Sequence, residues 1–240
     1  MRILALECSA SPASCCVYED GVLSGEFFLN IKTTHSQVLL PMVDSLLKTL
    51  SLTPKDIDIF AISFGPGSFT GLRIGISSVK GMAFGGEKNC LGVSTLLSMA
   101  YNFLDTDCIV CATMDARCKQ VYNALFSVEN GVVKRITEDR ALMCSELYDE
   151  ICSIRQLKNY SKSPIIVCGD GADMFFEFVK DINGVRLASD TRKFQHSSGV
   201  ALCAAETLKT EEPISADELN ALYLRLPQAE RELKKKKGEI

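Results

Sequence analysis

The sequence has little histidine, no tryptophan, no long apolar run and little net charge. Its 240 residues hold two histidines, His35 and His196. They are far apart in the sequence, and nothing in the pattern predicts that they converge on a metal. No stretch approaches the eighteen continuous apolar residues of a membrane span. The net charge of −4 gives no overall field that would attract nucleic acid.

An export signal is also missing from the sequence pattern. The apolar run after Arg2 stops at Glu7, and no cleavage-type region follows. We therefore expect a cytoplasmic protein without a membrane contact. Its eleven cysteines are odd in number and lie mostly in apolar runs, so we expect reduced thiols packed in the core. Cys108 and Cys111 have CxxC spacing, but on a strand they would point to opposite faces, which argues against a shared metal.

The stretch 64–83, FGPGSFTGLRIGISSVKGMA, carries the most specific local pattern. The apolar run 58–64 has the length of a buried strand, the glycines and proline of 65–67 form a tight turn, and Ser68 or Thr70 can cap the helix that follows. A glycine turn before a helix N-terminus is an anion site in principle. The alternative is a turn that only lets the helix pack on a sheet. The turn does not have the Walker spacing, and no Gly-Lys-Ser/Thr follows it.

Two helices of this first part have unusual faces. In the helix after the turn, Gly71, Gly75 and Ser78 share a face with almost no side chain, although each internal glycine costs about 1 kcal/mol against alanine. Another backbone can pack closely on such a face. The helix expected over 36–50 is apolar around a wide circumference, with Leu40 and Leu47 falling away from its main face, so we expect it to contact both a sheet and something else.

One order of elements occurs twice, about 106 residues apart. Strand, hairpin, helix, strand, glycine turn and helix appear in both parts, which indicates two related halves. We expect an α/β fold of two mixed sheets with helices, as in the actin-like and sugar-kinase-like superfamily, with halves at 1–103 and 104–240. The expected elements are strands at 2–8, 15–18, 22–31, 58–64, 107–114, 121–128, 132–136 and 165–168, and helices at 36–50, 68–84, 145–157 capped by Ser145, 172–179 and 199–208, with 219–226 docking back.

The eleven residues 65–75, GPGSFTGLRIG, resemble the signature of the TsaB (YeaZ) family. The resemblance continues in ILALECS near the amino terminus, in THSQVLLPMVDSLL, in MDAR followed by Tyr122, and in YLR near the end. It implies the actin-like architecture and a non-catalytic scaffold subunit. Such a subunit pairs with a TsaD-type catalytic subunit and a TsaE-type ATPase to form threonylcarbamoyladenosine at position 37 of tRNA. It also implies self-dimerisation when the chain is alone.

The resemblance further implies which residues meet partners and ligands. The partner interface is expected on the first two helices, at His35, Ser36, Leu39, Leu40, Val43, Gly71, Arg73, Ile74, Gly75 and Ser78. Contacts to a phosphate or nucleotide are expected at Glu7, Gly65, Gly67, Ser68, Asp115 and Arg117. No cofactor of its own is expected, with ATP or ADP held at the partner interface.

Catalytic chemistry is not expected. The catalytic relative carries two metal-binding histidines four residues apart, and this sequence has Thr95 and Met99 at that register. Glu7 stands where the family usually has aspartate, and it either supports a phosphate or simply binds the 9–11 turn. Asp115 and Arg117 form either an acid with an anion holder or a structural ion pair.

Two other functions stay open: an actin-like enzyme that uses ATP itself, and a stand-alone protein that self-associates. No G-x-S-x-G motif supports serine hydrolysis. The lysine run within 230–238 is interpreted as a solvated tail, with a weak RNA contact as the alternative.

Overall fold

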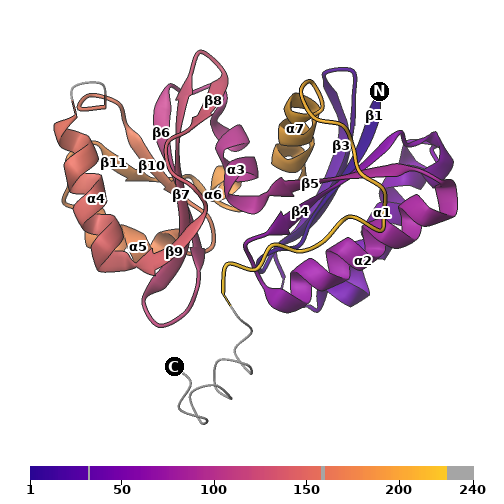
Figure 1. The fold of residues 1–240 in the computed structure, drawn as a ribbon, viewed down its shortest axis with the longest axis horizontal. Coiled ribbons are helices and arrows are strands. Elements are labelled where there is room, and N and C mark those ends of the chain that lie inside the picture. Colours follow the sequence, from indigo (N-terminus) through magenta and orange to yellow (C-terminus); the bar gives the residue numbers. More distant parts are fainter. Residues whose placement is uncertain (32, 158–159, 226–240) are drawn as a thin grey trace, which may run out of the picture.

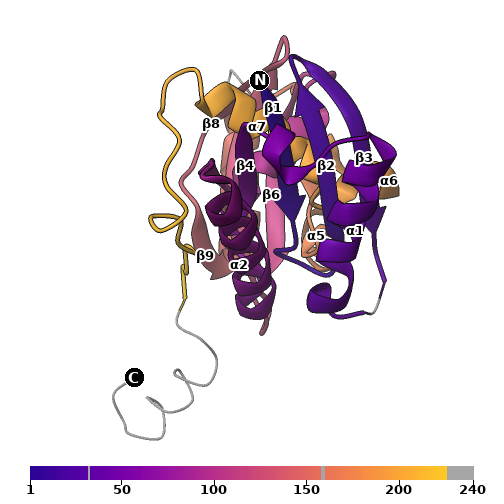
Figure 2. The ribbon, with the colours of Figure 1, turned by 90° about the vertical axis from the view of Figure 1, so that its right-hand side faces the viewer.

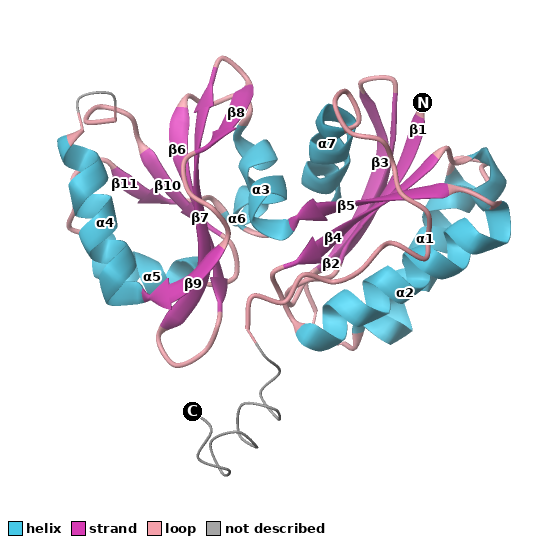
Figure 3. Cartoon of the chain, in the orientation of Figure 1, coloured by secondary structure: helices cyan, strands magenta, loops and turns pink. Residues whose placement is uncertain are grey.

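Two mixed sheets with the same connectivity form the protein (Figures 1 and 3). The computed structural model describes residues 1–31, 33–157 and 160–225, so the lysine-rich run lies outside the described residues. The first sheet has the order β3-β2-β1-β4-β5, and the second has β8-β7-β6-β10-β11 with β9 paired to β7. The two strand orders correspond element for element, which confirms the predicted repeat and the predicted fold class.

The first half follows the expected order closely. Its strands are β1 (Arg2–Glu7), β2 (Ala13–Glu19), β3 (Val22–Leu29), β4 (Ile59–Gly65) and β5 (Asn89–Ser94). β1 is antiparallel to β2 and parallel to β4, and all its positions after Arg2 are buried. A short 3₁₀ turn, Pro54–Asp56, leads into β4.

Helices α1 (His35–Thr49) and α2 (Phe69–Gly86) lie side by side on the outer face of this sheet (Figure 2). Ser68 is the N-cap of α2 and accepts a hydrogen bond from the amide of Gly71 at 3.3 Å, as one of the two predicted caps. One detail of α1 differs from expectation. Leu47 is buried, because the segment after α1 folds back over it, whereas Leu40 is 49% exposed.

The second half repeats this plan. Its strands and helices are β6 (Cys108–Asp115), β7 (Gln120–Glu129), β8 (Val132–Arg135), β9 (Arg140–Met143), α4 (Cys144–Gln156), β10 (Ile165–Cys168), α5 (Ala172–Val179), β11 (Val185–Leu187) and α6 (Asp190–Lys193). Ser145 was expected to cap α4, but it lies inside the helix. Met143 is the N-cap, and the Glu146 carboxylate accepts its backbone N–H at 2.7 Å. Cys108 and Cys111 belong to core clusters on opposite faces of β6, as the strand pattern predicted.

Each of the halves predicted at 1–103 and 104–240 contributes one helix that packs on the sheet of the other half. α3 (Thr95–Ala100) and the 3₁₀ turn Tyr101–Phe103 follow β5 but pack on the second sheet. α7 (Ser197–Thr207) follows the second half but packs on the first sheet, where Val200 and Ala204 join the core that contains Ile3. Both helices therefore lie between the two sheets (Figure 1).

The Glu26 carboxylate on β3 holds the first turn of α7. It accepts hydrogen bonds from the backbone N–H and hydroxyl of Ser198, at 2.9 and 3.1 Å, and from the Ser197 hydroxyl at 2.9 Å. A carboxylate at a helix N-terminus is favoured both by the free N–H groups and by the helix dipole. The crossing of α7 onto the first sheet is thus fixed at its first turn.

Residues 214–225, here called the strap, return along the first half toward the gap between the halves. Ile214 pairs with Cys90 in an antiparallel bridge, with N–O distances of 2.7 and 2.9 Å. Leu219 is 1% exposed in the outer core of the first sheet. The predicted docking of the chain after residue 219 is confirmed where the Leu222 N–H donates to the Phe64 carbonyl at 2.8 Å.

Candidate functional site

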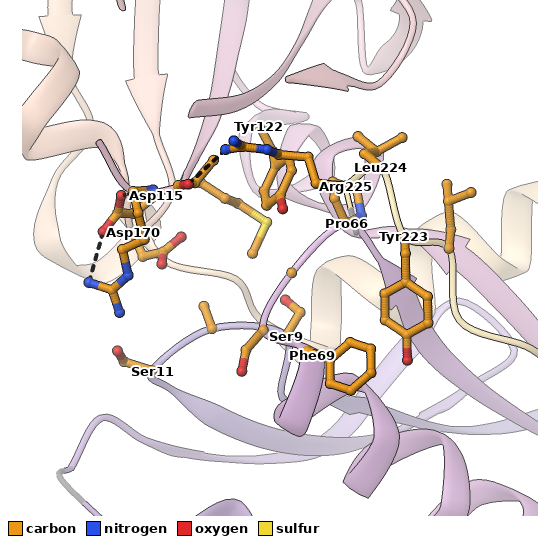
Figure 4. Close-up of a pocket in the computed structure, with 17 residues that line it drawn as sticks. Ser9, Ser11, Pro66, Phe69, Asp115, Tyr122, Asp170, Tyr223, Leu224 and Arg225 are labelled. Carbon is orange, nitrogen blue, oxygen red and sulfur yellow. Dashed lines mark hydrogen bonds and ion pairs between the residues drawn. The ribbon is translucent and has the colours of Figure 1, made fainter. Parts of the chain in front are cut away.

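A cavity of about 310 Å³ lies between the two halves (Figure 4). Its walls come from the loop after β1, the turn before α2, the end of β6 with the turn that follows it, the turn after β10, and the end of the strap. The lining residues are Ser9, Ala10, Ser11, Pro66, Gly67, Ser68, Phe69, Met114, Asp115, Ala116, Arg117, Tyr122, Asp170, Leu222, Tyr223, Leu224 and Arg225.

The glycine turn before α2 packs against the loop after β1. A Cβ on Gly67 would lie 2.6 Å from the Ser9 carbonyl oxygen, and the Ser68 N–H donates to that oxygen at 2.6 Å. Gly65 has φ of +132°, and a side chain there would collide with the backbone of Leu222. These contacts give the turn a structural reason for its glycines. Gly67 and Ser68 line the cavity, as the nucleotide prediction required, but Gly65 is covered by the strap.

Glu7, which was predicted to contact a phosphate or nucleotide, is not among the residues that line the cavity. It is fully buried at the end of β1, where one carboxylate oxygen accepts the Ser9 N–H at 2.6 Å and the other accepts the Ser63 hydroxyl. Burial raises its pKa, although these hydrogen bonds oppose the rise. The structural alternative, in which Glu7 binds the turn at Ser9, describes what the structure contains.

Asp115 and Arg117 meet at the far wall of the cavity. The Asp115 carboxylate accepts the Arg117 N–H at 2.7 Å and forms an ion pair with its guanidinium at 3.3 Å. The Arg117 side chain is 82% exposed, so this pair contributes little to stability. The two residues line the cavity as predicted and also form the ion pair that was the alternative.

Asp170 is a cavity residue that the sequence reasoning missed. Burial raises its pKa to about 6, and the negative charges of Asp115 and Glu7 add to the rise. Its Oδ1 accepts a hydrogen bond from the Gln195 amide at 3.1 Å. The hydroxyl of Ser9, another residue of the lining, is buried with no partner among the described residues. The signal was present in the sequence, because Gly169-Asp170-Gly171 is the second copy of the glycine turn that ends β4.

A second candidate surface is the groove between α1 and α2. Its central part, of about 340 Å³, is lined by His35, Ser36, Leu39, Leu40, Arg73, Ile74, Ser77 and Ser78. An adjoining hollow of about 380 Å³ is lined in part by Leu40, Val43, Leu47 and Met82. Eight of the ten predicted interface residues therefore lie together along one groove.

At the remaining two, Gly71 and Gly75, an added side chain would point into the chain. Gly71 still lines the hollow at the N-terminal ends of α1 and α2, so only the assignment of Gly75 to the interface is corrected. A Cβ on Gly71 would collide with the Cys8 carbonyl oxygen, and one on Gly75 would collide with the Cys8 sulfur and lie 2.9 Å from a carbon of Ile62. The backbone that packs on this small face is the chain's own β1 end. Ser78 lies at the edge of the outer surface, with its hydroxyl bound to the Ile74 carbonyl.

Arg73 links the groove to the strap. Its guanidinium lies over the Phe69 ring at 3.8 Å and donates to the Tyr223 hydroxyl at 3.3 Å, while the Phe69 and Tyr223 rings are 4.8 Å apart. Arg73 is thus exposed on α2 but held by contacts within the chain.

The positions expected to replace metal ligands lie in the core. Thr95 and Met99 are fully buried on α3. His35 starts α1 and contacts the Ser11 carbonyl at 3.2 Å, and His196 stacks on Phe28 before α7. Within residues 1–31, 33–157 and 160–225, no group of three histidine, cysteine or acidic side chains forms a metal-binding cluster.

Comparisons with known proteins show which family this chain resembles. Residues 29–230 match the family model described as TsaD, tRNA N6-adenosine threonylcarbamoyltransferase. The chain is 26% identical over 232 residues to the tRNA threonylcarbamoyladenosine biosynthesis protein TsaB of Bacillus subtilis, covering 96% of each chain. It is 36% identical over 152 residues to TsaB of Escherichia coli, covering 62% of this chain and 65% of that protein.

The fold has a counterpart among solved structures. The structure of YeaZ from Pseudomonas aeruginosa aligns with a TM-score of 0.75 and 24% identity, over 93% of this chain and 99% of that one. The described helices include none that is long and apolar enough to cross a membrane.

Proposed function

We propose, because this chain belongs to the TsaB (YeaZ) family and has a role in tRNA threonylcarbamoyladenosine biosynthesis, that it serves there as a non-catalytic scaffold subunit. In this proposal it pairs with a TsaD-type catalytic subunit, works with a TsaE-type ATPase, and reaches tRNA through the complex. A cytoplasmic location follows from a substrate that is tRNA.

The observation that carries the proposal is the open groove on α1 and α2. Leu40 is 49% exposed at its centre, and Leu39, Ile74 and Met82 also line the groove. Apolar side chains gathered on one exposed surface are typical of interaction sites. The groove is also long, because the central part and the adjoining hollow share Leu40.

The proposal that this subunit is not catalytic rests on two residues of α3. Threonine and methionine do not bind a hard metal alongside carboxylates as imidazole does. Thr95 and Met99 are also closed off from ligands by their burial. A metal-dependent transfer would therefore need residues from the partner.

For a nucleotide we propose a place at the partner interface. The N-terminal ends of α1 and α2 border a hollow of about 590 Å³ that is lined by Thr34, His35, Ser68 and Thr70, among others. Helix N-termini favour anions through their free N–H groups and the helix dipole. A partner that closes over this hollow would enclose a phosphate.

The test is pairing of purified Leu40→Glu and Ser78→Glu variants with a TsaD-type subunit, with ATP present and absent. An unpaired charge buried in an interface costs about 3–5 kcal/mol, so we expect pairing and self-dimerisation to weaken by about a hundredfold or more. Val132→Glu is the matched control, because Val132 is equally apolar and 55% exposed but lies on β8. Normal pairing of both groove variants would place the interface elsewhere.

The interdomain cavity favours a second candidate, an actin-like enzyme that uses ATP itself. It carries Asp115 and Asp170 beside a helix N-terminus. Steady ATP turnover by the purified chain, lost in Asp115→Asn, would support this candidate and contradict the scaffold proposal. The scaffold proposal expects no turnover above that of buffer.

A further inference from the structure

The strap runs from the first half toward the second. Ile214 and Leu219 fix the first part to the first half through the bridge to Cys90 and through burial in the core. The last part crosses the gap, and the Arg225 guanidinium donates to the Ala116 carbonyl at 3.0 Å. In Figure 4, Arg225 extends from the strap across the cavity toward the Asp115 wall.

The two ends of the strap differ in how firmly they are held. Leu219 is 1% exposed, whereas Leu222 and Tyr223 are 37% and 39% exposed. The crossing end is held by the Leu222–Phe64 backbone bond, by the Phe69–Tyr223–Arg73 stack and by Arg225. Segments with few buried apolar contacts and exposed hydrogen bonds open first.

The turn that receives Arg225 is strained. Arg117, Cys118 and Lys119 have φ of 67°, 55° and 56°, three consecutive non-glycine residues in the left-handed region. Such residues persist only where surrounding contacts hold them. The Ala116 carbonyl is directly before this run, so its bond to Arg225 is one of those contacts.

We propose that the strap is a latch. Its Arg225 side chain ties the turn 116–119 to the first half and forms part of one wall of the interdomain cavity, and release of that contact widens the cavity and relaxes the turn. With the strap in place the cavity measures about 310 Å³, at the lower limit of small-molecule pockets, which run from roughly 300 to 1,000 Å³. Residues 222–225 form one wall, so the latch sets the size of ligand that the cavity holds.

The test is amide hydrogen exchange on the full chain for Arg225→Ala. We expect exchange at least tenfold faster in two cavity walls, residues 8–12 and 116–120, and unchanged exchange in β1 and β6. The control is Arg186→Ala, which removes an exposed arginine of β11. Tyr223→Ala, which removes the stack on Phe69, should accelerate the same two walls.

Two outcomes would overturn the latch. Unchanged exchange at 8–12 and 116–120 in both strap variants would make Arg225 a surface contact without control over the cavity. A uniform rise that includes β1 and β6, with a matching fall in melting temperature, would show global loss of stability instead of local release.

Discussion

Gly71→Ala and Gly81→Ala place the same methyl group at a packed and at an open position of α2, and we expect opposite effects on stability. A Cβ on Gly71 would collide with the Cys8 carbonyl oxygen, a backbone atom that cannot rotate away. A Cβ on Gly81 meets nothing within 4 Å. Both substitutions gain helix propensity, which is worth about 1 kcal/mol.

The propensity gain stands alone at Gly81, so Gly81→Ala should raise the free energy of unfolding by about 0.5–1 kcal/mol. At Gly71 it is opposed by overpacking, which typically costs about 1–3 kcal/mol and more against fixed backbone. We expect Gly71→Ala to lower the free energy of unfolding by about 2 kcal/mol. For a chain of this length that corresponds to roughly 4–8 °C in melting temperature.

The assay is urea unfolding followed by circular dichroism, at a concentration that keeps the chain monomeric. The dependence on urea should be the same for both variants, because the surface exposed on unfolding is unchanged. If Gly71→Ala were as stable as Gly81→Ala, then the close contact of α2 with the β1 end would not hold the first half together. Gly71 would then be assigned to the partner surface, as the sequence pattern predicted.

Three further outcomes follow from the buried groups. Burial raises the pKa of Asp170 to about 6 in the folded state, so the folded state binds more protons than the unfolded state between about pH 4 and pH 6. The free energy of unfolding therefore falls as pH rises through that range. We expect Asp170→Asn to be more stable than wild type at pH 7, and this advantage should vanish in unfolding titrations near pH 4. Thiol titration should find eleven free thiols after unfolding. In the native chain Cys118 is exposed, Cys152 is half-buried and the other nine are buried, so we expect the fastest thiol to disappear in Cys118→Ser. More than one remaining reactive thiol after that change would contradict the burial of the nine. Burial raises the pKa of Glu26, but its contacts with His196 and Ser198 outweigh burial and leave that pKa lowered. Glu26→Ala should lower the free energy of unfolding by about 1–2 kcal/mol at pH 7, and by less as pH falls below about 4. A loss of stability that does not depend on pH would show that the carboxylate charge does not hold α7.

The repeat was predictable because each half carries its own local signals. Glycine turns, hairpin residues and apolar periods recur in the same order, and these signals act within a few residues. They gave the bounds of β10 and α5 without error. The assignment of helices to sheets was not predictable in this way, because a helix pattern shows that a face is buried and not which sheet buries it.

α7 shows what such a non-local contact leaves in the sequence. Its buried positions are mostly small, and a Cβ on Gly199 would lie 2.5 Å from the Ser98 carbonyl of α3. The small residues thus report a close crossing of two helices between the sheets. Asp170 was missed for a related reason, since its pKa and its place in the cavity depend on Asp115 and Gln195, which are distant in the chain.

The two sides of α2 explain why the motif at residues 65–75 is long and specific for its family. Positions 71, 75 and 79 recur every four residues on the inner side of α2 and are all buried. Arg73 and Ile74 fall between them on the outer side, where they line the groove. The motif therefore has to satisfy the contact with the β1 end and the outer surface at once. A change on the inner side should lower the free energy of unfolding, and the molecules that remain folded should still pair with the partner. A change on the outer side should weaken pairing and leave the free energy of unfolding unchanged. If Gly71→Ala and Ser78→Glu altered both properties together, then the two sides of α2 would not be separate, and the assignment of the groove to partners would lose its basis.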